Sequence, residues 1–164
     1  MRVLEIFIDG ACSGNPGDAG IGVVVYENGQ LIREISKFIG NATNNIAEYT
    51  ALIFALQEAM VLKAEQVKIN TDSQLLYEQL IGHYKVKNAN LKVLIDQVQH
   101  LAQGFKKLEI VQIPREKNQE ADRLATQAIQ QERAKVVAPV SHVAKSFVMT
   151  PGRKVRAPKD DVSC

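Results

Sequence analysis

Apolar and polar residues follow two different patterns along the chain. Short apolar runs rich in β-branched residues are typical of buried strands, whereas apolar residues spaced three or four positions apart indicate one face of a helix. These patterns predict strands at residues 3–8, 21–26, 30–39, 66–71 and 108–113, and helices at 45–62, 73–81, 91–101 and 119–131. Residues 10–20 are rich in Gly, Ser, Asn and Pro and are predicted to form a turn.

The order of these elements predicts an α/β fold in which helices flank a mixed sheet. The first three strands follow one another closely, and Asn28-Gly29 favours a tight hairpin turn between the second and the third. Helices separate the later strands, which therefore have to pair in parallel. We expect the first strand and the strand at 66–71 to be central neighbours that each end in Asp, at the sheet edge where α/β proteins place their sites.

Two predicted helices have a clear apolar face. The inward residues of the first are expected to be Tyr49, Leu52, Ile53, Leu56 and Met60, and those of the last are expected to be Ala121, Leu124, Ala125 and Ala128. Asn118 is expected to cap the last helix.

Charge is distributed unevenly along the chain. Residues 1–133 hold 14 Lys/Arg and 16 Asp/Glu, a net charge of −2, and residues 134–164 hold six Lys/Arg and two Asp/Glu, a net charge of +4. The helical pattern also fades after Glu132. We therefore expect one folded domain at 1–133 and a basic C-terminal tail at 134–164.

Composition limits the cellular compartments in which the protein is expected. The apolar stretches are short and the N-terminus does not resemble a signal peptide, so no membrane association is expected. The two cysteines, Cys12 and Cys164, do not make a disulfide framework, which favours the reducing cytoplasm. A monomer is expected.

Four acidic residues are candidates for metal ligands: Asp9, Glu48, Asp72 and Asp122. Each also has a structural interpretation. Asp9 could end a strand at a turn, and Glu48 could form a capping box with Asn45. Asp72 could cap the helix that follows it, and Asp122 could be a surface acid near a helix N-terminus.

The joint placement of the acids favours the metal site. Asp9 and Asp72 follow strands that should be adjacent, and Glu48 and Asp122 lie early in helices that should pack on that sheet. Four converging carboxylates repel one another unless cations lie between them. Two Mg²⁺ ions about 4 Å apart fit such a set of oxygen ligands, and they are suited to cleaving a phosphodiester.

Small polar residues near these acids point to a nucleic acid. Gly14 to Gly17 form a turn that a sugar–phosphate backbone could approach, and Thr43, Asn44 and Asn45 lie at a helix N-terminus that could bind phosphate. Gln74 follows Asp72 closely and could bind a 2′-hydroxyl or a base edge.

Four motifs resemble type 1 ribonuclease H over about residues 3–132, in order and with fitting spacings. They are Asp9-Gly10…Gly14-Asn15-Pro16-Gly17, Thr43-Asn44-Asn45-x-x-Glu48, Thr71-Asp72-Ser73-Gln74 and Asn118-x-x-Ala121-Asp122-x-Leu124-Ala125. The resemblance implies the ribonuclease H-like fold, a five-stranded mixed sheet in the order 3-2-1-4-5 flanked by helices. It also implies a Mg²⁺- or Mn²⁺-dependent endonuclease that cleaves the RNA strand of RNA–DNA hybrids and leaves 5′-phosphate ends.

The resemblance also implies roles for single residues. Asp9, Glu48, Asp72 and Asp122 would be the catalytic metal ligands. The expected substrate-binding residues are Cys12, Asn15, Thr43, Asn44, Asn45, Gln74 and Arg115, with Thr43 at a DNA-phosphate pocket.

The sequence departs from many family members in two places. The loop before the last Asp is the short segment 114–117, in which no His occurs, and Arg115 is expected to substitute in part, as in a short-loop, archaeal-like branch. The basic, Trp-containing protrusion is also missing, because residues 82–90 offer only Lys85 and Lys87 as cations and the chain has no Trp.

Other functions stay open at this point. A broadened nuclease that also cuts double-stranded RNA is one alternative, since both substrates present an A-form-like RNA strand. A non-catalytic nucleic-acid-binding module is another, although all four acids are present. A proofreading-type exonuclease would carry Asp-x-Glu on the first strand, where this chain has Asp9-Gly10-Ala11.

Overall fold

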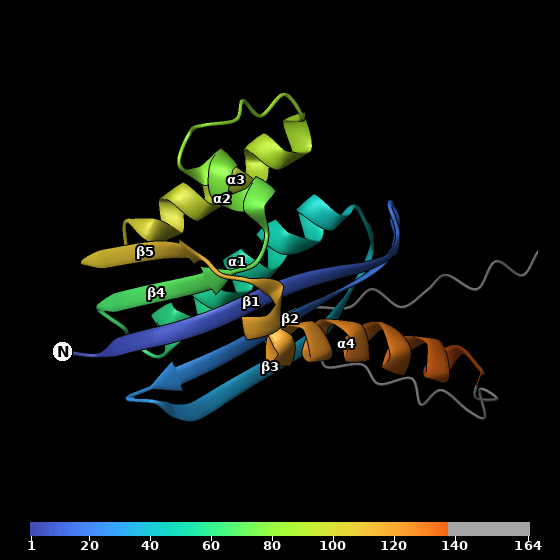
Figure 1. Ribbon diagram of the computed structural model, residues 1–164, viewed down its shortest axis with the longest axis horizontal. Helices are drawn as coiled ribbons and strands as arrows, with labels where there is room; N and C mark the ends of the chain where they lie inside the picture. The colour runs from blue at the N-terminus through green and yellow to red at the C-terminus, as the bar shows by residue number, and fades with distance from the viewer. Residues whose placement is uncertain (138–164) are drawn as a thin grey trace, which may run out of the picture.

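Five strands form one mixed sheet in the order β3-β2-β1-β4-β5, which confirms the predicted order and class (Figure 1). The structure is a computed structural model and describes residues 1–137. The first three strands pair antiparallel, and β1–β4 and β4–β5 pair in parallel. The strands are β1 (Val3–Gly14), β2 (Gly17–Glu27), β3 (Gln30–Ala42), β4 (Gln66–Thr71) and β5 (Lys107–Gln112).

Helices cover both faces of the sheet (Figure 1). The α-helices are α1 (Asn44–Val61), α2 (Gln74–Leu80), α3 (Ala89–Ala102) and α4 (Gln119–Val137), and a 3₁₀ helix, η1 (Arg115–Lys117), precedes the last of them. α1 packs on β1 and β2 and against α3, whereas α4 packs on β2, β3 and β1. Within residues 1–137, no helix is both long and apolar enough to cross a bilayer.

The main core lies between the sheet and α1. Leu4, Ile6 and Ile8 of β1 alternate inward and pack in one core with Tyr49, Leu52 and Leu56 of α1, and all six are without solvent exposure. The predicted inward faces of α1 and α4 are confirmed except at Met60, which lies in the last turn of α1 and is 46% exposed. The predicted tight hairpin is confirmed too, since Asn28 and Gly29 both have positive φ.

The predicted turn at residues 10–20 is wrong. β1 and β2 stay paired from Gly10–Ile21 to Gly14–Gly17, which leaves only Asn15 and Pro16 between them. Asp9 therefore lies within a strand and does not end one. Glycines in this stretch weaken the strand signal in the sequence, although they suit strands that other backbones approach closely.

The last helix is longer than predicted. α4 begins at Gln119 as expected but continues to Val137, past residue 131 and past the expected domain boundary at 133. The rest of the predicted basic tail, residues 138–164, lies outside the described residues.

Two glycines of β2 allow α4 to lie directly on the sheet. A Cβ atom at Gly22 would be 2.0 Å from the backbone oxygen of Ala121, and one at Gly20 would be 2.4 Å from that of Ala125. Gly22 pairs with Asp9 across the β1–β2 ladder. The first turn of α4 is therefore held close to Asp9.

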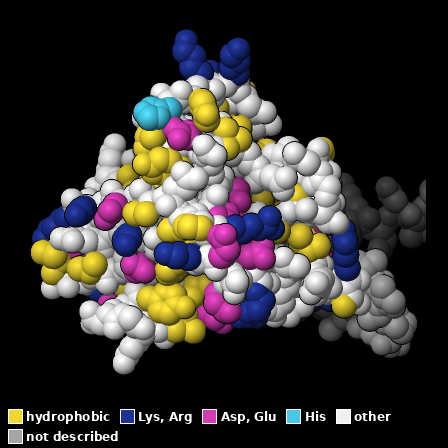
Figure 2. All heavy atoms as spheres, in the orientation of Figure 1, with side chains coloured by type: hydrophobic (Ala, Val, Ile, Leu, Met, Phe, Trp, Pro, Cys, Tyr) yellow, Lys and Arg dark blue, Asp and Glu magenta, His cyan; other side chains and the backbone are white. Residues whose placement is uncertain are grey.

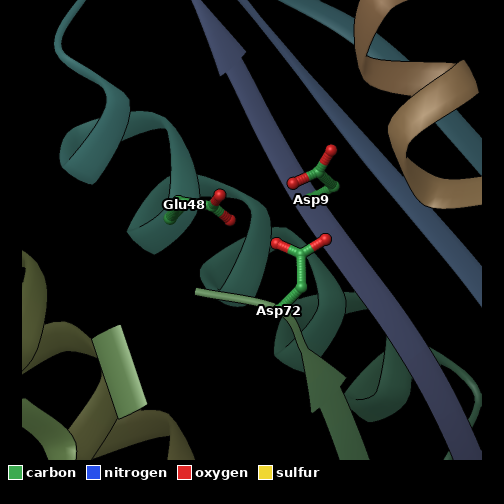
Figure 3. Close-up of side chains that lie close together, drawn as sticks. All are labelled: Asp9, Glu48 and Asp72. Carbon is green, nitrogen blue, oxygen red and sulfur yellow. The ribbon is translucent and has the colours of Figure 1, made fainter. Parts of the chain in front are cut away.

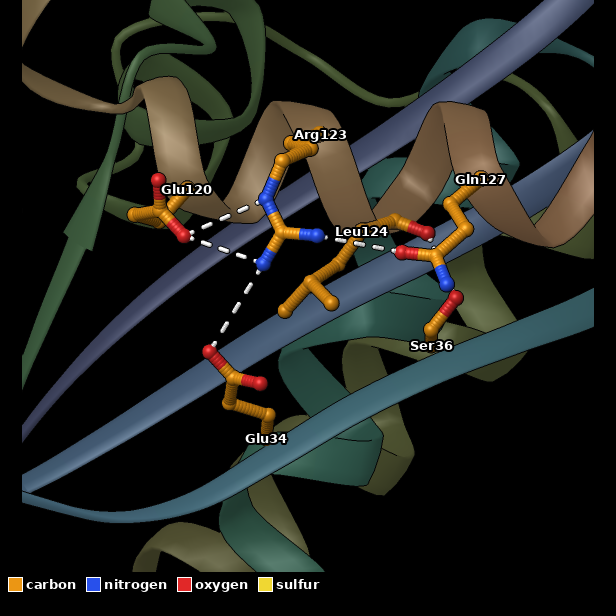
Figure 4. Close-up of polar contacts among 6 residues, drawn as sticks. All are labelled: Glu34, Ser36, Glu120, Arg123, Leu124 and Gln127. Carbon is orange, nitrogen blue, oxygen red and sulfur yellow. Dashed lines mark hydrogen bonds and ion pairs between the residues drawn. The ribbon is translucent and has the colours of Figure 1, made fainter.

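Polar contacts fix α4 over β3 as well (Figure 4). The Ser36 hydroxyl donates a 2.7 Å hydrogen bond to the backbone oxygen of Leu124. Arg123 pairs with Glu120 at 3.1 Å and approaches Glu34 at 3.8 Å, and its guanidinium also donates to Gln127. The exposed ion pairs contribute little each, so the glycine contacts and the Ser36 bond do most to set the position of the helix.

Candidate active site

Three carboxylates from distant parts of the chain meet at one place. Asp9 lies in β1, Glu48 in α1 and Asp72 directly after β4, and one oxygen from each lies within 4.8 Å of the others (Figure 3). Asp9 is 5% exposed and Glu48 is 9% exposed. Buried acids this close together are unusual unless they bind a cation.

The unequal lengths of two neighbouring strands bring these acids together. β4 ends at Thr71, which pairs with Ile8, whereas β1 continues past Asp9 to Gly14. Beyond Asp9, no strand among residues 1–137 pairs with β1 on the side of β4. A side chain from α1 on one face of the sheet can therefore reach Asp9 through this opening.

Gly10 allows α1 to pack close enough to β1 for Glu48 to reach Asp9. A Cβ atom at Gly10 would lie 2.4 Å from the backbone carbon of Ala47 and 2.5 Å from the backbone nitrogen of Glu48. The backbone N–H of Gly10 donates a 3.1 Å hydrogen bond to Glu48 Oε2. Gly10 thus permits the contact and also orients the carboxylate.

Asp122 joins the same site from the opposite face of the sheet. It lies in the first turn of α4 and lines, with the three clustered acids, a cleft of about 560 Å³. The cleft is also lined by Gly10, Ala11, Cys12, Asn44, Arg115 and Thr126. Figure 2 shows Asp and Glu side chains gathered near the middle of this face, with Lys and Arg side chains beside them.

Asn118 has a different role from the predicted helix cap. Its side chain is 1% exposed and donates to the backbone oxygen of Ile8 at 2.8 Å and to Asp72 Oδ2 at 3.2 Å. It therefore connects β1 with Asp72, and its side-chain oxygen accepts no hydrogen bond from the described backbone of α4. The motif Asn118-x-x-Ala121-Asp122 was the only sign of this in the sequence, and a cap was the simpler interpretation.

Burial and mutual repulsion raise the pKa of the three clustered acids. Burial, followed by the charge of Asp72, raises the pKa of Asp9 to about 8. Burial and the charge of Asp9 raise the pKa of Glu48 well above its usual value. Burial also raises the pKa of Asp72, although Asn118 and Arg115 act in the opposite direction. These shifts reflect an excess of negative charge in the cleft, which Arg115 offsets only in part.

We expect the stability of the metal-free protein to fall as pH rises. The folded state binds the Asp9 proton more tightly than the unfolded state, so this stabilisation is complete below the ordinary pKa of 3.8 and is lost as pH rises through about 8. Between pH 5 and pH 8 the free energy of unfolding should drop by on the order of 3–4 kcal/mol.

Urea titrations in chelator at several pH values measure this slope. Asp9→Asn should reduce the dependence of the unfolding free energy on pH. The substitution removes one proton-binding group, and it lowers the pKa of Glu48 because the charge of Asp9 is gone. Mg²⁺ should restore stability at pH 8 in the parent protein. A slope that is the same in Asp9→Asn would contradict the assignment to these acids.

The structural interpretations of the acids fail for three of the four. The Thr43 hydroxyl caps α1, so Asn45 and Glu48 do not form a capping box. The Ser73 hydroxyl caps α2, so Asp72 does not. Asp9 lies within a strand. Asp122 does lie in the first turn of its helix, where an acid also suits the helix dipole.

Only some of the predicted substrate-binding residues line the cleft. Cys12, Asn44 and Arg115 line it, whereas Asn15, Thr43, Asn45 and Gln74 do not. Asn15 Oδ1 accepts a 3.1 Å hydrogen bond from the backbone of Asn44, and Gln74 is the exposed first residue of α2. The Cys12 thiol donates to the backbone oxygen of Ala42, and burial raises its pKa.

Neither described histidine lies in the cleft. His83 pairs with Glu78 at 2.7 Å, and His100 lies between α1 and α3. His142 lies outside the described residues. Among residues 1–137, Arg115 at the start of η1 is the one basic side chain that lines the cleft. Sequence reasoning missed two residues at the site, Asn118 and Thr126.

Comparison with known proteins agrees with this geometry. The family described as reverse transcriptase-like matches residues 7–128. The bifunctional protein Rv2228c of Mycobacterium tuberculosis is 40% identical over 157 residues, which cover 93% of this chain and 43% of that protein. The chain thus spans less than half the length of this curated relative.

Solved structures of ribonuclease H1 are similar over most of this chain. Ribonuclease H1 of the archaeon Halobacterium salinarum has a TM-score of 0.77 at 36% identity, covering 79% of this chain and 98% of that one. The compost-derived LC11-RNase H1, solved in complex with an RNA/DNA hybrid, has a TM-score of 0.75 at 40% identity, covering 79% of this chain and 99% of that one. From its acids, its sheet order and these likenesses, the chain belongs to the type 1 ribonuclease H family.

Proposed function

We propose that this protein is a metal-dependent endonuclease that hydrolyses the RNA strand of RNA–DNA hybrids and leaves 5′-phosphate ends. The observation that carries the proposal is the convergence of Asp9, Glu48 and Asp72 within 4.8 Å at an open cleft. The hybrid bound to LC11-RNase H1, a structure 40% identical to this chain, supports the choice of substrate.

The donor set suits Mg²⁺ or Mn²⁺. All candidate ligands are carboxylate oxygens, the type that hard divalent cations prefer, and the four acids share the cleft with one described basic side chain, Arg115. We propose Asp9, Glu48, Asp72 and Asp122 as the ligands of two ions. When bound, the two ions supply charge stabilisation for the attacking and leaving oxygens of the phosphodiester.

The remaining residues of the site position these acids and the substrate. The Gly10 N–H holds Glu48, and Asn118 holds Asp72, so both carboxylates are oriented before any ligand arrives. Arg115 offers a guanidinium at the rim, where a phosphate could accept hydrogen bonds. Asn15, Asn44, Asn45 and Gln74 are proposed to contact the minor groove, and Thr43 the DNA strand.

One cleavage assay tests the proposal directly. Purified protein is incubated with labelled RNA–DNA hybrid, double-stranded RNA and double-stranded DNA, with chelator, Mg²⁺, Mn²⁺ or Ca²⁺. We expect the hybrid to be cut with Mg²⁺ or Mn²⁺ only, because Ca²⁺ is larger and tolerates looser geometry. Cleavage in chelator, or no cleavage of the hybrid under any condition, would refute the function.

Double-stranded RNA is the alternative substrate to distinguish. It shares 2′-hydroxyls and an A-like groove with the hybrid, so the recognition residues named above do not exclude it. Comparable cleavage of both duplexes would show a broadened nuclease. Binding without cleavage of either would show a nucleic-acid-binding module.

We also propose that a basic tail adds to substrate binding. Residues 138–164 carry five Lys/Arg and two Asp/Glu, whereas residues 1–137 carry 15 Lys/Arg and 16 Asp/Glu. Deleting residues 138–164 should raise KM for the hybrid several-fold at low salt and reduce its salt dependence, because phosphate contacts release counterions. kcat should stay the same. Steady-state kinetics at several salt concentrations measure both effects, and an unchanged salt slope would contradict the proposal.

A further inference from the structure

The hairpin of β1 and β2 extends past the end of its neighbour β4. β4 ends opposite Ile8, whereas β1 and β2 stay paired as far as Gly14 and Gly17. We call residues 10–21 the hairpin extension. Its turn contains Asn15, one of the proposed substrate contacts. Because β4 does not support this part of β1, contacts with the helices have to keep the turn in place.

Arg133, near the end of α4, makes such a contact. Its Nη2 donates a 2.7 Å hydrogen bond to the Ser13 hydroxyl, and its Nε pairs with Asp18 Oδ2 at 3.2 Å. Ser13 and Asp18 are partners across the β1–β2 ladder, next to the pair that closes the turn. One planar guanidinium thus joins both strands of the hairpin extension to α4, which a lysine ammonium could not do with the same geometry. The contact exists because α4 continues past residue 131, where the sequence pattern predicted its end.

The hairpin extension is also held near the start of α1, which covers the opposite face of the sheet from α4. The Cys12 thiol donates to the backbone oxygen of Ala42 at 3.2 Å. Asn15 Oδ1 accepts a 3.1 Å hydrogen bond from the backbone N–H of Asn44, which lines the cleft. Polar contacts therefore hold the turn from both faces of the sheet. Loss of Arg133 would remove those on the α4 face and let the turn shift relative to the cleft.

We propose that Arg133 is a positioning residue that holds the turn, and with it Asn15, in the place from which Asn15 contacts the substrate. The inference rests on the proposed function, in which Asn15 binds the RNA–DNA hybrid. Arg133 does not line the cleft that holds the four acids. Its effect should therefore fall on KM and leave kcat unchanged, as for any contact that is equally strong in the ground state and the transition state.

The test combines a variant of Arg133 with a variant of Asn15. Arg133→Gln keeps a similar reach but removes the charge and the fork of donors. Arg123→Gln is the matched control, because Arg123 also lies on α4 and pairs with acids, Glu120 and Glu34, that lie outside the hairpin extension. KM and kcat for the hybrid are measured for both variants, for Asn15→Ala, and for Asn15→Ala combined with Arg133→Gln. Amide hydrogen exchange without substrate, followed by mass spectrometry, reports on the hairpin itself.

Arg133→Gln should raise KM for the hybrid about 3- to 5-fold, the upper range for an exposed ion pair, and keep kcat within about twofold. Exchange should become faster in the peptide of residues 11–19. In the Asn15→Ala background the same substitution should change KM by less than about 1.5-fold, because the side chain that Arg133 positions is gone. Arg123→Gln should leave KM, kcat and the exchange of this peptide unchanged.

Three results would overturn the proposal. An unchanged KM in Arg133→Gln, even with faster exchange, would show a structural role only. A KM rise of full size in the Asn15→Ala background would show that Arg133 acts on the substrate directly, as a phosphate contact would. A KM rise of equal size in Arg123→Gln would show a general effect of surface charge. Cleavage by the parent protein tests the proposed function separately. Its absence would refute that function and the substrate role of Arg133 together, whereas the exchange data would still show whether Arg133 holds the hairpin.

Discussion

Asp72→Asn is expected to lower the rate of hybrid cleavage at least about a thousandfold, because stabilisation by bound cations dominates this type of chemistry. Asp9→Asn and Glu48→Gln should have effects of similar size. Each change keeps the shape of the side chain and removes one charged ligand from the cluster. Single-turnover cleavage of a labelled hybrid in Mg²⁺ measures the loss.

The fold should survive these substitutions. Removing one of several repelling, buried carboxylates relieves a cost of folding, so the variants should be at least as stable as the parent in chelator at pH 8. Asp96→Asn, an exposed acid on α3, is the matched control and should leave both activity and stability unchanged. Near-parental Mg²⁺ activity in Asp72→Asn would refute the metal-site assignment.

Asp122→Asn should have a smaller effect than the other three. Asp122 lines the cleft, but it is not one of the three acids whose oxygens lie within 4.8 Å of one another. An asparagine oxygen can still act as a neutral ligand there. Comparing all four variants under identical conditions should therefore rank Asp122→Asn as the most active.

Gly10→Ala is expected to destabilise the protein by about 3 kcal/mol and to reduce cleavage even in the folded fraction. The added Cβ would lie 2.4 Å from the backbone of Ala47, and a helix backbone cannot give way as a side-chain end can. α1 has to move off β1, which carries Glu48 away from Asp9 and weakens its hydrogen bond to Gly10. Urea unfolding and activity well below the unfolding temperature separate the two effects.

Gly104→Ala provides the control for Gly10→Ala. Its nearest contacts would be the backbone oxygen of Leu101 at 3.3 Å and the flexible end of Met60 at 3.5 Å, so a small adjustment is enough. The change in unfolding free energy should stay within about 0.5 kcal/mol, and activity should not change. Equal destabilisation by both substitutions would show that close packing at Gly10 is not the cause.

The sequence by itself determined the elements and their order. Apolar periodicity identified every strand and α-helix, because each element buries one face and the repeat of that face is local. Helical crossovers then required parallel pairing of β4, which put the segments of Asp9 and Asp72 side by side. The two other acid segments, those of Glu48 and Asp122, were recognisable too, because a short polar motif beside an apolar run is visible without the fold.

The ends of elements were less predictable. The glycines between residues 10 and 20 indicated a turn, yet the strands continue through them, because glycine also suits a strand that another backbone approaches closely. The helical pattern in α4 faded before the helix ended at Val137. Local patterns carry little information about such ends, which depend on what packs against them.

Only the tertiary structure decided how the acids meet. The site depends on β4 ending beside Ile8 while β1 continues. It also depends on backbone contacts at Gly10 and Gly22, which set how closely α1 and α4 pack on the sheet. The partners of Asn118 and Arg133 are likewise far from them in sequence. Strand register and helix docking are set by packing between distant segments, so no local pattern in the chain encodes them.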